Sequence, residues 1–310
     1  MSLSRTNEYR RMRPYLGTFV EIGVSGLSPS PAAKAVERAF TCIATVEARM
    51  SAHAATSDLG ELYRAPANTT VKLHPWTIDV IAAARELHRL SHGVFDITVG
   101  NILARRKLLP SWRSPRELSG RGSMADFELL SDGRIRVHRP THIDLGGIAK
   151  GFAVDRAMEV LLESRPSAVW VNAGGDMRTY GNRAHPLLVR DPATPSRILW
   201  IGEIQNGAVA TSSGYFTSQR GISRRDSPLV DGRSGRMRRL RDSITVIASN
   251  CMWADGLTKV LALDSVIGAQ LLERFSATAW VLRTQRQGST NPIMPRLTAI
   301  RSEPGAKAMS

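Results

Sequence analysis

Residues 142–155 read His-Ile-Asp-Leu-Gly-Gly-Ile-Ala-Lys-Gly-Phe-Ala-Val-Asp, which is typical of a strand end, a glycine turn and the first turns of a helix. Gly146 and Gly147 have no Cβ, so their backbone N–H groups can approach an anion closely. The helix that follows adds partial positive charge at its N-terminus. Asp144 and Lys150 place opposite charges on either side of the turn. The stretch predicts either a phosphate-binding turn or a plain strand-to-helix connection, and the rest of the chain has to decide between them.

The composition is that of a globular protein with an unusual set of basic residues. The chain has 310 residues, 42% of them hydrophobic, which is enough for a substantial core. The formal net charge is +15, but only six of the 42 basic residues are lysine and the rest are arginine. The arginines are scattered without interleaved aromatic residues. We therefore expect no nucleic-acid partner, whereas small anionic ligands are favoured by the positive charge.

The cysteines and the N-terminus show no metal, redox or export motif. Cys42 and Cys251 are far apart, and we expect reduced thiols in the core. The pair Arg10-Arg11 has no apolar run behind it, so it does not read as a secretory or twin-arginine signal. No stretch is long enough to span a membrane. As written, the chain is expected in the cytoplasm, or in the periplasm if a leader was removed.

Periodicity and turn residues predict a mixture of strands and helices. The predicted elements are a strand at 15–22, a helix from Ser30-Pro31 to about Met50, a short helix after Ser57, a helix at 79–91, a hairpin at Gly133, a helix to about Ser164, strands at 168–171, 187–190, 198–204, 207–212 and 243–248, and a helix from Cys251. Residues 101–140 have weak periodicity, and we expect surface structure there. We predict one α+β domain over residues 9–285, with layered antiparallel β-sheets and flanking helices, and a polar tail over 286–310.

Three further stretches place polar groups in turns. Residues 172–176, Asn-Ala-Gly-Gly-Asp, follow the strand at 168–171 and can bring backbone N–H groups and a carboxylate to one sheet edge. The hydroxyl groups at 210–215 can bind phosphate or cap a turn. Asp96, in the otherwise apolar turn 93–100, can also cap a turn or bind the ring or ribose of a ligand.

The helix from Cys251 carries a small polar cluster. Asp255 precedes Thr258 by three residues and Lys259 by four, so the three side chains share one helix face. From this spacing alone, a surface ion pair between Asp255 and Lys259 is the simplest interpretation.

Eight short motifs resemble, in the same order, those of the flavin transferase family named ApbE, over roughly residues 12–285. Each motif is weak evidence alone, but eight in the right order are specific. They are Leu-Gly-Thr at 16–18, Ser-Asp-Leu at 57–59, Phe-Asp-Ile-Thr-Val-Gly at 95–100, Asp-Leu-Gly-Gly-Ile-Ala-Lys-Gly at 144–151, Asn-Ala-Gly-Gly-Asp at 172–176, Ala-Thr-Ser at 210–212, Asp-Gly-Arg-Ser-Gly at 231–235 and Ala-Asp-Gly-Leu-Thr at 254–258.

The resemblance implies a T-fold-like enzyme that binds FAD and Mg²⁺, cleaves the FAD pyrophosphate and attaches FMN to a Thr or Ser hydroxyl of an acceptor flavoprotein. Such chemistry depends mainly on neutralising charge and positioning the nucleophile. The implied metal site lies between the backbone carbonyl of Gly147 and the carboxylate of Asp255, an all-oxygen set suited to Mg²⁺. Asp255 and Lys259 occupy the implied catalytic positions. The residues implied to contact FAD are Leu16, Val94, Phe95, Asp96, Lys150, Val230 and Thr258.

The chain departs from the family pattern in three places. Lys259 stands where the family has a metal-binding threonine, with Thr258 one place earlier; a protonated lysine cannot ligate Mg²⁺ but can act as a point charge on phosphates. Pro228 replaces the family's histidine and Gly232 the proline of the same segment, so the histidine's acid, base or orienting function is lost. The glycine of Thr-Ser-Gly lies one place later, at Gly214. A non-catalytic FAD-binding protein, a flavin carrier or regulator, is therefore the alternative.

Overall fold

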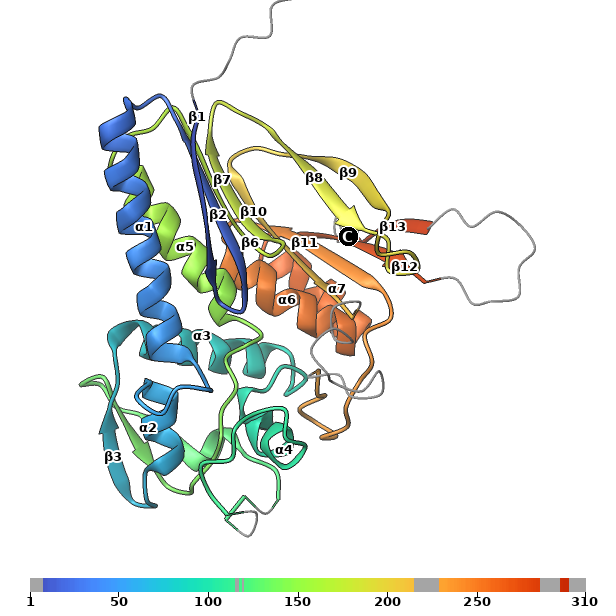
Figure 1. Cartoon of the computed structure of the whole chain (residues 1–310). Coiled ribbons are helices and arrows are strands. Elements are labelled where there is room, and N and C mark those ends of the chain that lie inside the picture. Colours follow the sequence, from blue (N-terminus) through green and yellow to red (C-terminus); the bar gives the residue numbers. More distant parts are fainter. Residues whose placement is uncertain (1–7, 115–116, 119, 215–228, 285–295, 301–310) are drawn as a thin grey trace, which may run out of the picture.

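An eight-stranded antiparallel sheet forms the centre of the computed structural model, which describes residues 8–114, 117–118, 120–214, 229–284 and 296–300 (Figure 1). Its strand order is β1-β2-β6-β7-β10-β11-β12-β13. The strands are β1 (Glu8–Tyr15), β2 (Thr18–Ser25), β6 (Ala168–Ala173), β7 (Asp176–Gly181), β10 (Gly207–Ser213), β11 (Ser243–Ala248), β12 (Thr278–Arg283) and β13 (Arg296–Ile300).

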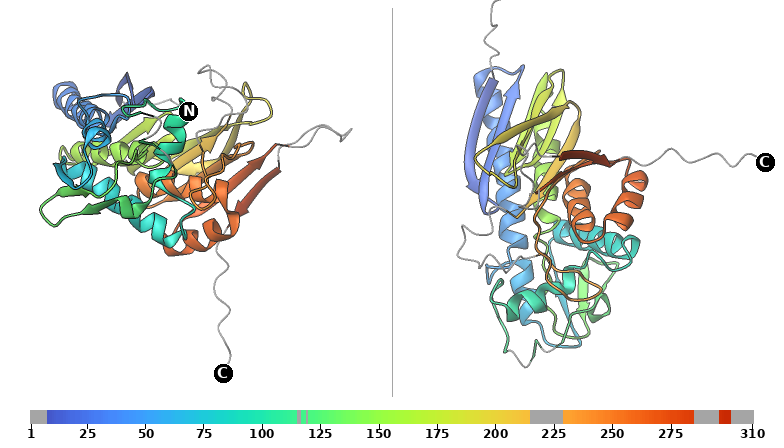
Figure 2. Two further views of the ribbon diagram at one scale, coloured as in Figure 1. Left: turned by 90° about the horizontal axis from the view of Figure 1, so that it is seen from below. Right: turned by 90° about the vertical axis from the view of Figure 1, so that its right-hand side faces the viewer.

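Helices cover one face of this sheet (Figures 1 and 2). They are α1 (Pro29–Met50), α5 (Ala149–Leu162), α6 (Cys251–Leu263) and α7 (Ser265–Arg274). Helix α5 packs between α1 and α6 and lies against β6 and β7, whereas α6 lies against β10 and β11. The hairpin of β8 (His185–Arg190) and β9 (Ile198–Ile204) packs through Leu187 and Ile204 against Val209 of β10. These layers place the N-terminal ends of α5 and α6 next to each other.

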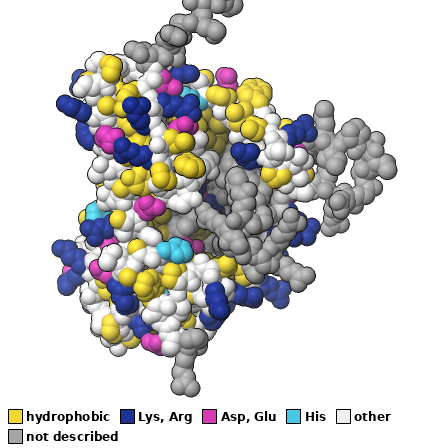
Figure 3. Space-filling model, viewed as in Figure 1, with side chains coloured by type: hydrophobic (Ala, Val, Ile, Leu, Met, Phe, Trp, Pro, Cys, Tyr) yellow, Lys and Arg dark blue, Asp and Glu magenta, His cyan; other side chains and the backbone are white. Residues whose placement is uncertain are grey.

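A smaller set of elements lies below the central sheet in Figure 1. It comprises α2 (Asp58–Arg64), α3 (Pro75–Leu90), α4 (Gly100–Arg105) and a three-stranded sheet of β3 (Thr69–Lys72), β5 (Arg134–Val137) and β4 (Phe127–Leu129), with short 3₁₀ turns at Ile97–Val99 and Met124–Asp126. Among the described residues, no helix combines the length and apolarity needed to span a bilayer. On the face shown in Figure 3, Lys and Arg side chains lie in several separate groups with acidic and hydrophobic side chains between them.

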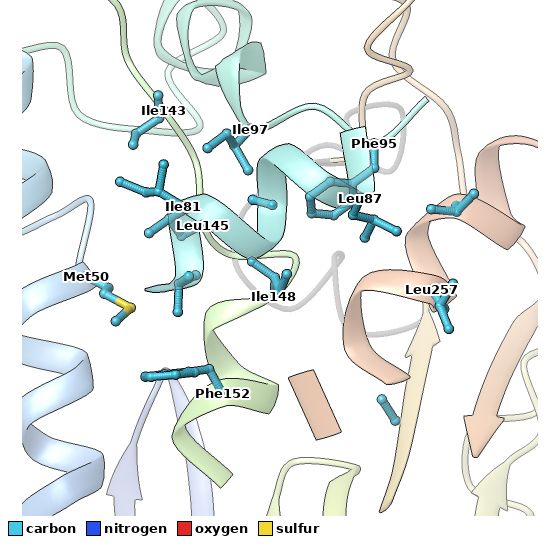
Figure 4. Packing of buried hydrophobic residues seen from close by; sticks show 14 of the residues in the cluster. Met50, Ile81, Leu87, Phe95, Ile97, Ile143, Leu145, Ile148, Phe152 and Leu257 are labelled. Carbon is cyan, nitrogen blue, oxygen red and sulfur yellow. The ribbon is translucent and has the colours of Figure 1, made fainter. Parts of the chain in front are cut away.

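One hydrophobic core joins the two parts. It includes Met50 at the end of α1, Leu87 of α3, Ile148 just before α5 and Leu257 of α6, all of which are drawn in Figure 4. Burying these side chains against one another fixes the small elements to the helices of the large sheet, at a gain of roughly 25 cal/mol per Å² of apolar surface. The predicted α+β class with layered antiparallel sheets and flanking helices is confirmed.

In the stretch at 142–155 the predicted helix is confirmed, but the predicted strand end is wrong. Helix α5 begins at Ala149, as expected, but residues 141–145 form no strand. The segment is instead held by loop and helix partners: His142 N–H donates to Asn101 Oδ1 at 2.8 Å, Asp144 N–H donates to the carbonyl of Ile97 at 2.7 Å, and Ile143 accepts from the Tyr63 hydroxyl. Its apolar residues are explained by burial in the core and not by pairing in a sheet.

The strand predicted at 15–22 is confirmed for 18–22, which belong to β2, but its start is wrong because a hairpin turn lies at residues 16–17. Leu16 and Gly17 have φ values of +57° and +68°, and Tyr15 pairs with Thr18 across them. Positive φ at both central residues is typical of a two-residue hairpin whose twist matches its strands. The first strand, β1, was hidden by its arginines. Similarly, β13 lies within the segment 286–310 that was expected to be a tail, and it pairs with β12.

Two other expectations are corrected or limited. Surface structure at 101–140 is confirmed for the exposed hairpin turn at Gly133 but is wrong for α4, where Ile102, Leu103 and Ala104 are buried. Residues 231–235 form a turn, closed by a hydrogen bond from Gly235 N–H to the carbonyl of Asp231 and flanked by a bridge between Val230 and Met237. Pro228 itself lies outside the described residues.

Candidate functional site

A cleft with a volume of about 1540 Å³ opens where three glycine turns meet. One turn is the β1–β2 hairpin at Leu16-Gly17, the second precedes α5 at Asp144 to Gly146, and the third joins β6 to β7 at Gly174-Gly175. The end of α1 and the β8 strand form other walls. Small-molecule sites commonly have volumes of about 300–1000 Å³. This cleft is larger, so it has room for a ligand at or above the upper end of that size range.

Glycine geometry makes the meeting of these turns possible. Gly174 and Gly175 have φ values of +61° and +104°, which side chains rarely adopt. A Cβ on Gly174 would lie only 2.4 Å from Thr18 Oγ1, so the two hairpins can approach only because this residue is glycine. On the other turn, Leu16 N–H donates to Glu47 Oε1 of α1 at 2.8 Å. This part of the cleft wall therefore depends on glycine conformations and on a backbone hydrogen bond to α1.

Two buried aspartates, each contacted by a lysine ammonium group, lie beside the cleft. Lys150 Nζ, at the start of α5, contacts Asp176 Oδ2, and Lys259 Nζ contacts Asp255 Oδ1 on α6. The side chains of Asp176 and Asp255 are 1% and 0% exposed, whereas those of Lys150 and Lys259 retain 26% and 19%. We refer to these four residues as the lysine–aspartate cluster. The predicted pair of Asp255 and Lys259 exists, but it is not on the surface.

The pKa values in the cluster follow from burial and from the neighbouring charges. Burial raises the pKa of Asp176 to about 6, and the nearby charge of Asp255 acts in the same direction. Burial also raises the pKa of Asp255, but Lys259 and Lys150 more than offset it, so the net pKa is lowered. For Lys150, burial lowers the pKa. The charges of Asp176 and Asp255 raise it by more, so the net pKa lies above its usual range. At neutral pH, Asp255 is therefore ionised and Lys150 is protonated.

Helices α5 and α6 cross closely at their N-terminal ends, and this crossing positions Asp255. A Cβ on Gly151 would lie 2.3 Å from the carbonyl oxygen of Cys251, so glycine is required there. Gly151 N–H donates to Asp255 Oδ2 at 3.2 Å. Asp155 of α5 accepts from the N–H groups of Cys251 and Met252 at 2.9 and 2.8 Å, which satisfies free donors at the start of α6.

The carboxylate of Asp255, which the resemblance implies as a ligand of Mg²⁺, already has partners within the chain. One oxygen of Asp255 contacts Lys259 and the other accepts from Gly151. The hydroxyl of Thr258 donates to the carbonyl of Asp255 and shares a hydrogen bond with Ser212 Oγ, both at 2.7 Å, so it is turned toward β10. Within the part of the chain that the structure describes, no three His, Cys, Asp or Glu side chains are grouped to hold a metal ion.

Lys259 also lies beside the other implied metal ligand. A Cβ on Gly147 would be 3.6 Å from Lys259 Cγ and 3.3 Å from Phe95 Cε2. The lysine side chain therefore passes next to Gly147 and ends on Asp255, the two residues that the resemblance implies as metal ligands.

The other residues predicted to bind FAD divide into three groups. Leu16 and Lys150 line the cleft. Asp96 caps the 3₁₀ turn at Ile97–Val99, with its carboxylate accepting from Thr98 N–H and Oγ1 at 2.8 and 2.7 Å, which is the capping alternative. Val94 and Val230 are buried, the latter against α4. Contact of these residues with FAD remains a prediction.

Asp176 is the one cluster member that was not predicted as a catalytic, FAD-binding or metal-binding residue, although its turn at 172–176 belongs to a matched motif. Its Oδ1 atom is buried and has no hydrogen-bond partner among the described residues. The motif Asn-Ala-Gly-Gly-Asp at 172–176 contained the signal, because a carboxylate directly after a glycine turn lies at the same sheet edge as the turn's N–H groups.

Comparison with known proteins agrees with this architecture. A model described as "ApbE family" matches residues 16–281, which is most of the chain. The chain belongs to the ApbE family. Its relatives include FAD:protein FMN transferases of Vibrio cholerae, 28% identical over 231 residues (68% of each chain), and of Chlamydia pneumoniae, 28% identical over 233 residues (69% of this chain and 71% of the other).

Solved ApbE structures share the whole fold. The flavin transferase ApbE from Vibrio cholerae has a TM-score of 0.78 at 22% identity, covering 96% of this chain and 98% of the other. The apo form of the Pseudomonas stutzeri flavinyl transferase ApbE gives 0.78 at 19% identity, with 97% of both chains covered. The resemblance noted from the eight motifs is thus confirmed at the level of family and fold.

Proposed function

We propose that this ApbE-family chain transfers FMN from FAD to a Thr or Ser hydroxyl of an acceptor flavoprotein. The observation that carries the proposal is the meeting of three glycine turns and Lys150 at one cleft. Backbone N–H groups and an ammonium are suited to bind a pyrophosphate. Relatives that share the family are named as FAD:protein FMN transferases, which supplies the substrate and the reaction class.

The chemistry asked of the residues is mainly electrostatic. The acceptor hydroxyl oxygen forms a bond to the phosphorus of the FMN half of FAD. The bond from that phosphorus to the bridging oxygen breaks, AMP leaves with the oxygen, and the hydroxyl proton is released to water. Lys150 and the N–H groups of the turn at 146–147 would stabilise the charge that develops on the phosphate oxygens. No step is assigned to Mg²⁺, because Lys259 contacts the expected ligand Asp255.

Incubation with FAD and an acceptor protein of the Vibrio cholerae transferase tests the proposal. The expected product is a fluorescent acceptor band whose intact mass has increased by one FMN. Replacement of the acceptor's target hydroxyl by Val or Ala should abolish the band. The proposal fails if flavin remains wholly non-covalent and no AMP is formed.

The alternative is an FAD-binding protein without transferase activity. It is favoured by the engagement of Asp255 with Lys259, which departs from the family's implied metal site. This alternative predicts flavin that co-purifies at close to one equivalent, or binds on titration, with no covalent product on any acceptor. The acceptor experiment therefore separates the two functions in one measurement.

A further inference from the structure

The lysine–aspartate cluster is balanced in charge without a metal ion. Asp176 and Asp255 contribute two negative charges when ionised, and Lys150 and Lys259 contribute two positive ones. A divalent ion added to this group would bring excess positive charge and would displace Lys259 from Asp255. The cluster thus differs from a pair of unpaired carboxylates, whose negative charge would have to be neutralised by a bound cation.

The geometry points to Lys259 as a built-in cation that replaces the divalent metal ion of the FAD site, so that this chain binds FAD without a divalent metal. The inference rests on the proposed function only in taking FAD as the ligand. Lys259 passes Gly147 and ends on Asp255, with 19% of its side chain exposed. The ammonium is a compact charge with three donors, so it can contact Asp255 and still donate to a phosphate oxygen.

The neighbouring threonine, Thr258, does not supply the metal ligand that is missing at position 259. Thr258 is fully buried, and its hydroxyl is occupied by Ser212 and by the carbonyl of Asp255. A metal ion would therefore have to share Asp255 with Lys259. The reverse change is informative, because Lys259→Thr removes the ammonium and leaves a fully buried carboxylate without its charge partner. Such a carboxylate favours binding of a cation from solution.

Direct metal binding is the first arm of the test and needs no FAD. Mn²⁺ is titrated by electron paramagnetic resonance into wild type, Lys259→Thr, and Lys34→Thr, which removes an exposed lysine of α1 as a matched control. We expect no stoichiometric Mn²⁺ site in wild type or Lys34→Thr. Lys259→Thr should gain one site, which disappears in the double variant with Asp255→Asn. A stoichiometric site in wild type that Asp255→Asn removes overturns the inference.

FAD affinity is the second arm, measured by calorimetry in excess EDTA and in MgCl₂. Wild type should show the same Kd in both buffers to within about twofold, whereas Lys259→Thr should bind at least about tenfold more weakly in EDTA and recover in MgCl₂. A wild-type affinity that falls about tenfold or more in EDTA also overturns the inference. If FAD binds in neither buffer, the proposed function fails, and the Mn²⁺ arm still decides the role of Lys259. If Lys259→Thr does not fold, the wild-type results in both arms decide.

Discussion

Asp176 shows how burial changes a single carboxyl group. Its pKa of about 6 reflects first its burial and then the nearby charge of Asp255. Because Asp176 contacts Lys150, its ionisation adds negative charge next to the residue that we expect to bind the FAD phosphates.

FAD affinity should therefore fall as pH rises from about 5 to about 7, with a change of a few-fold. Asp176→Asn carries no charge at either pH, so its affinity should depend less on pH and should exceed that of wild type near neutrality. Fluorescence titration of both proteins across this range measures the difference. Parallel pH profiles for the two proteins would contradict this role of Asp176.

His142 is a buried histidine that stays neutral. Its ring stacks on Tyr63 with centroids 4.1 Å apart, and neither ring nitrogen has a hydrogen-bond partner among the described residues. Burial, with a smaller effect from Arg113, lowers its pKa from 6.5 to about 4. Between these two values the unfolded state binds more protons than the folded state, so the free energy of unfolding falls as pH decreases through this window.

His142→Phe keeps a stacked ring but removes the titrating group. We expect its free energy of unfolding to decrease less than that of wild type between pH 6.5 and about 4. Urea denaturation of both proteins at the two ends of the window measures this difference. An equal loss of stability in both proteins would show that other groups cause the acid sensitivity.

At the scale of elements, the crossing of α5 and α6 depends on Asp155. This carboxylate accepts from two N–H groups at the start of α6 and pairs with Arg178 of β7 at 2.8 Å. It therefore joins two helices and a strand next to the lysine–aspartate cluster.

Asp155→Ala should lower the free energy of unfolding by about 2–4 kcal/mol, because it leaves two N–H groups at the start of α6 and a mostly buried arginine without their partner. Glu159→Ala on the same helix is the control. Its ion pair with Arg156 is only partly buried and lies on the helix surface, so the expected loss is below about 0.5 kcal/mol. Chemical denaturation gives both values, and equal losses would refute the capping role.

The sequence could predict those elements whose local signals agree with their surroundings. Strand β11 and helix α6 agree with the prediction, because the spacing of their apolar residues changes at the residues that end the strand and cap the helix. The β1 strand was missed because arginines obscure its alternation, and 142–148 was misread because a buried loop has the same apolar letters as a strand. The pairing of Lys150 with Asp176 could not be read from the letters, since it depends on how α5 and β7 pack.

At the scale of the whole molecule, the net charge of +15 should speed the association of anionic ligands. We expect the association rate of FAD, followed by stopped-flow fluorescence, to fall as salt shortens the Debye length from about 30 Å at 0.01 M to about 8 Å at 0.15 M. Riboflavin has no phosphate and serves as the control. Equal salt dependence for the two ligands would exclude electrostatic steering.

We propose above that the glycine turns and Lys150 form one site for the FAD pyrophosphate. The decisive measurement is calorimetric titration of FAD into wild type and Lys150→Met, because methionine keeps an unbranched chain only one atom shorter and removes the charge. One FAD should bind per wild-type chain, and its Kd should be at least about tenfold higher in Lys150→Met, with riboflavin affinity little changed. Equal FAD affinity in the two proteins would contradict it.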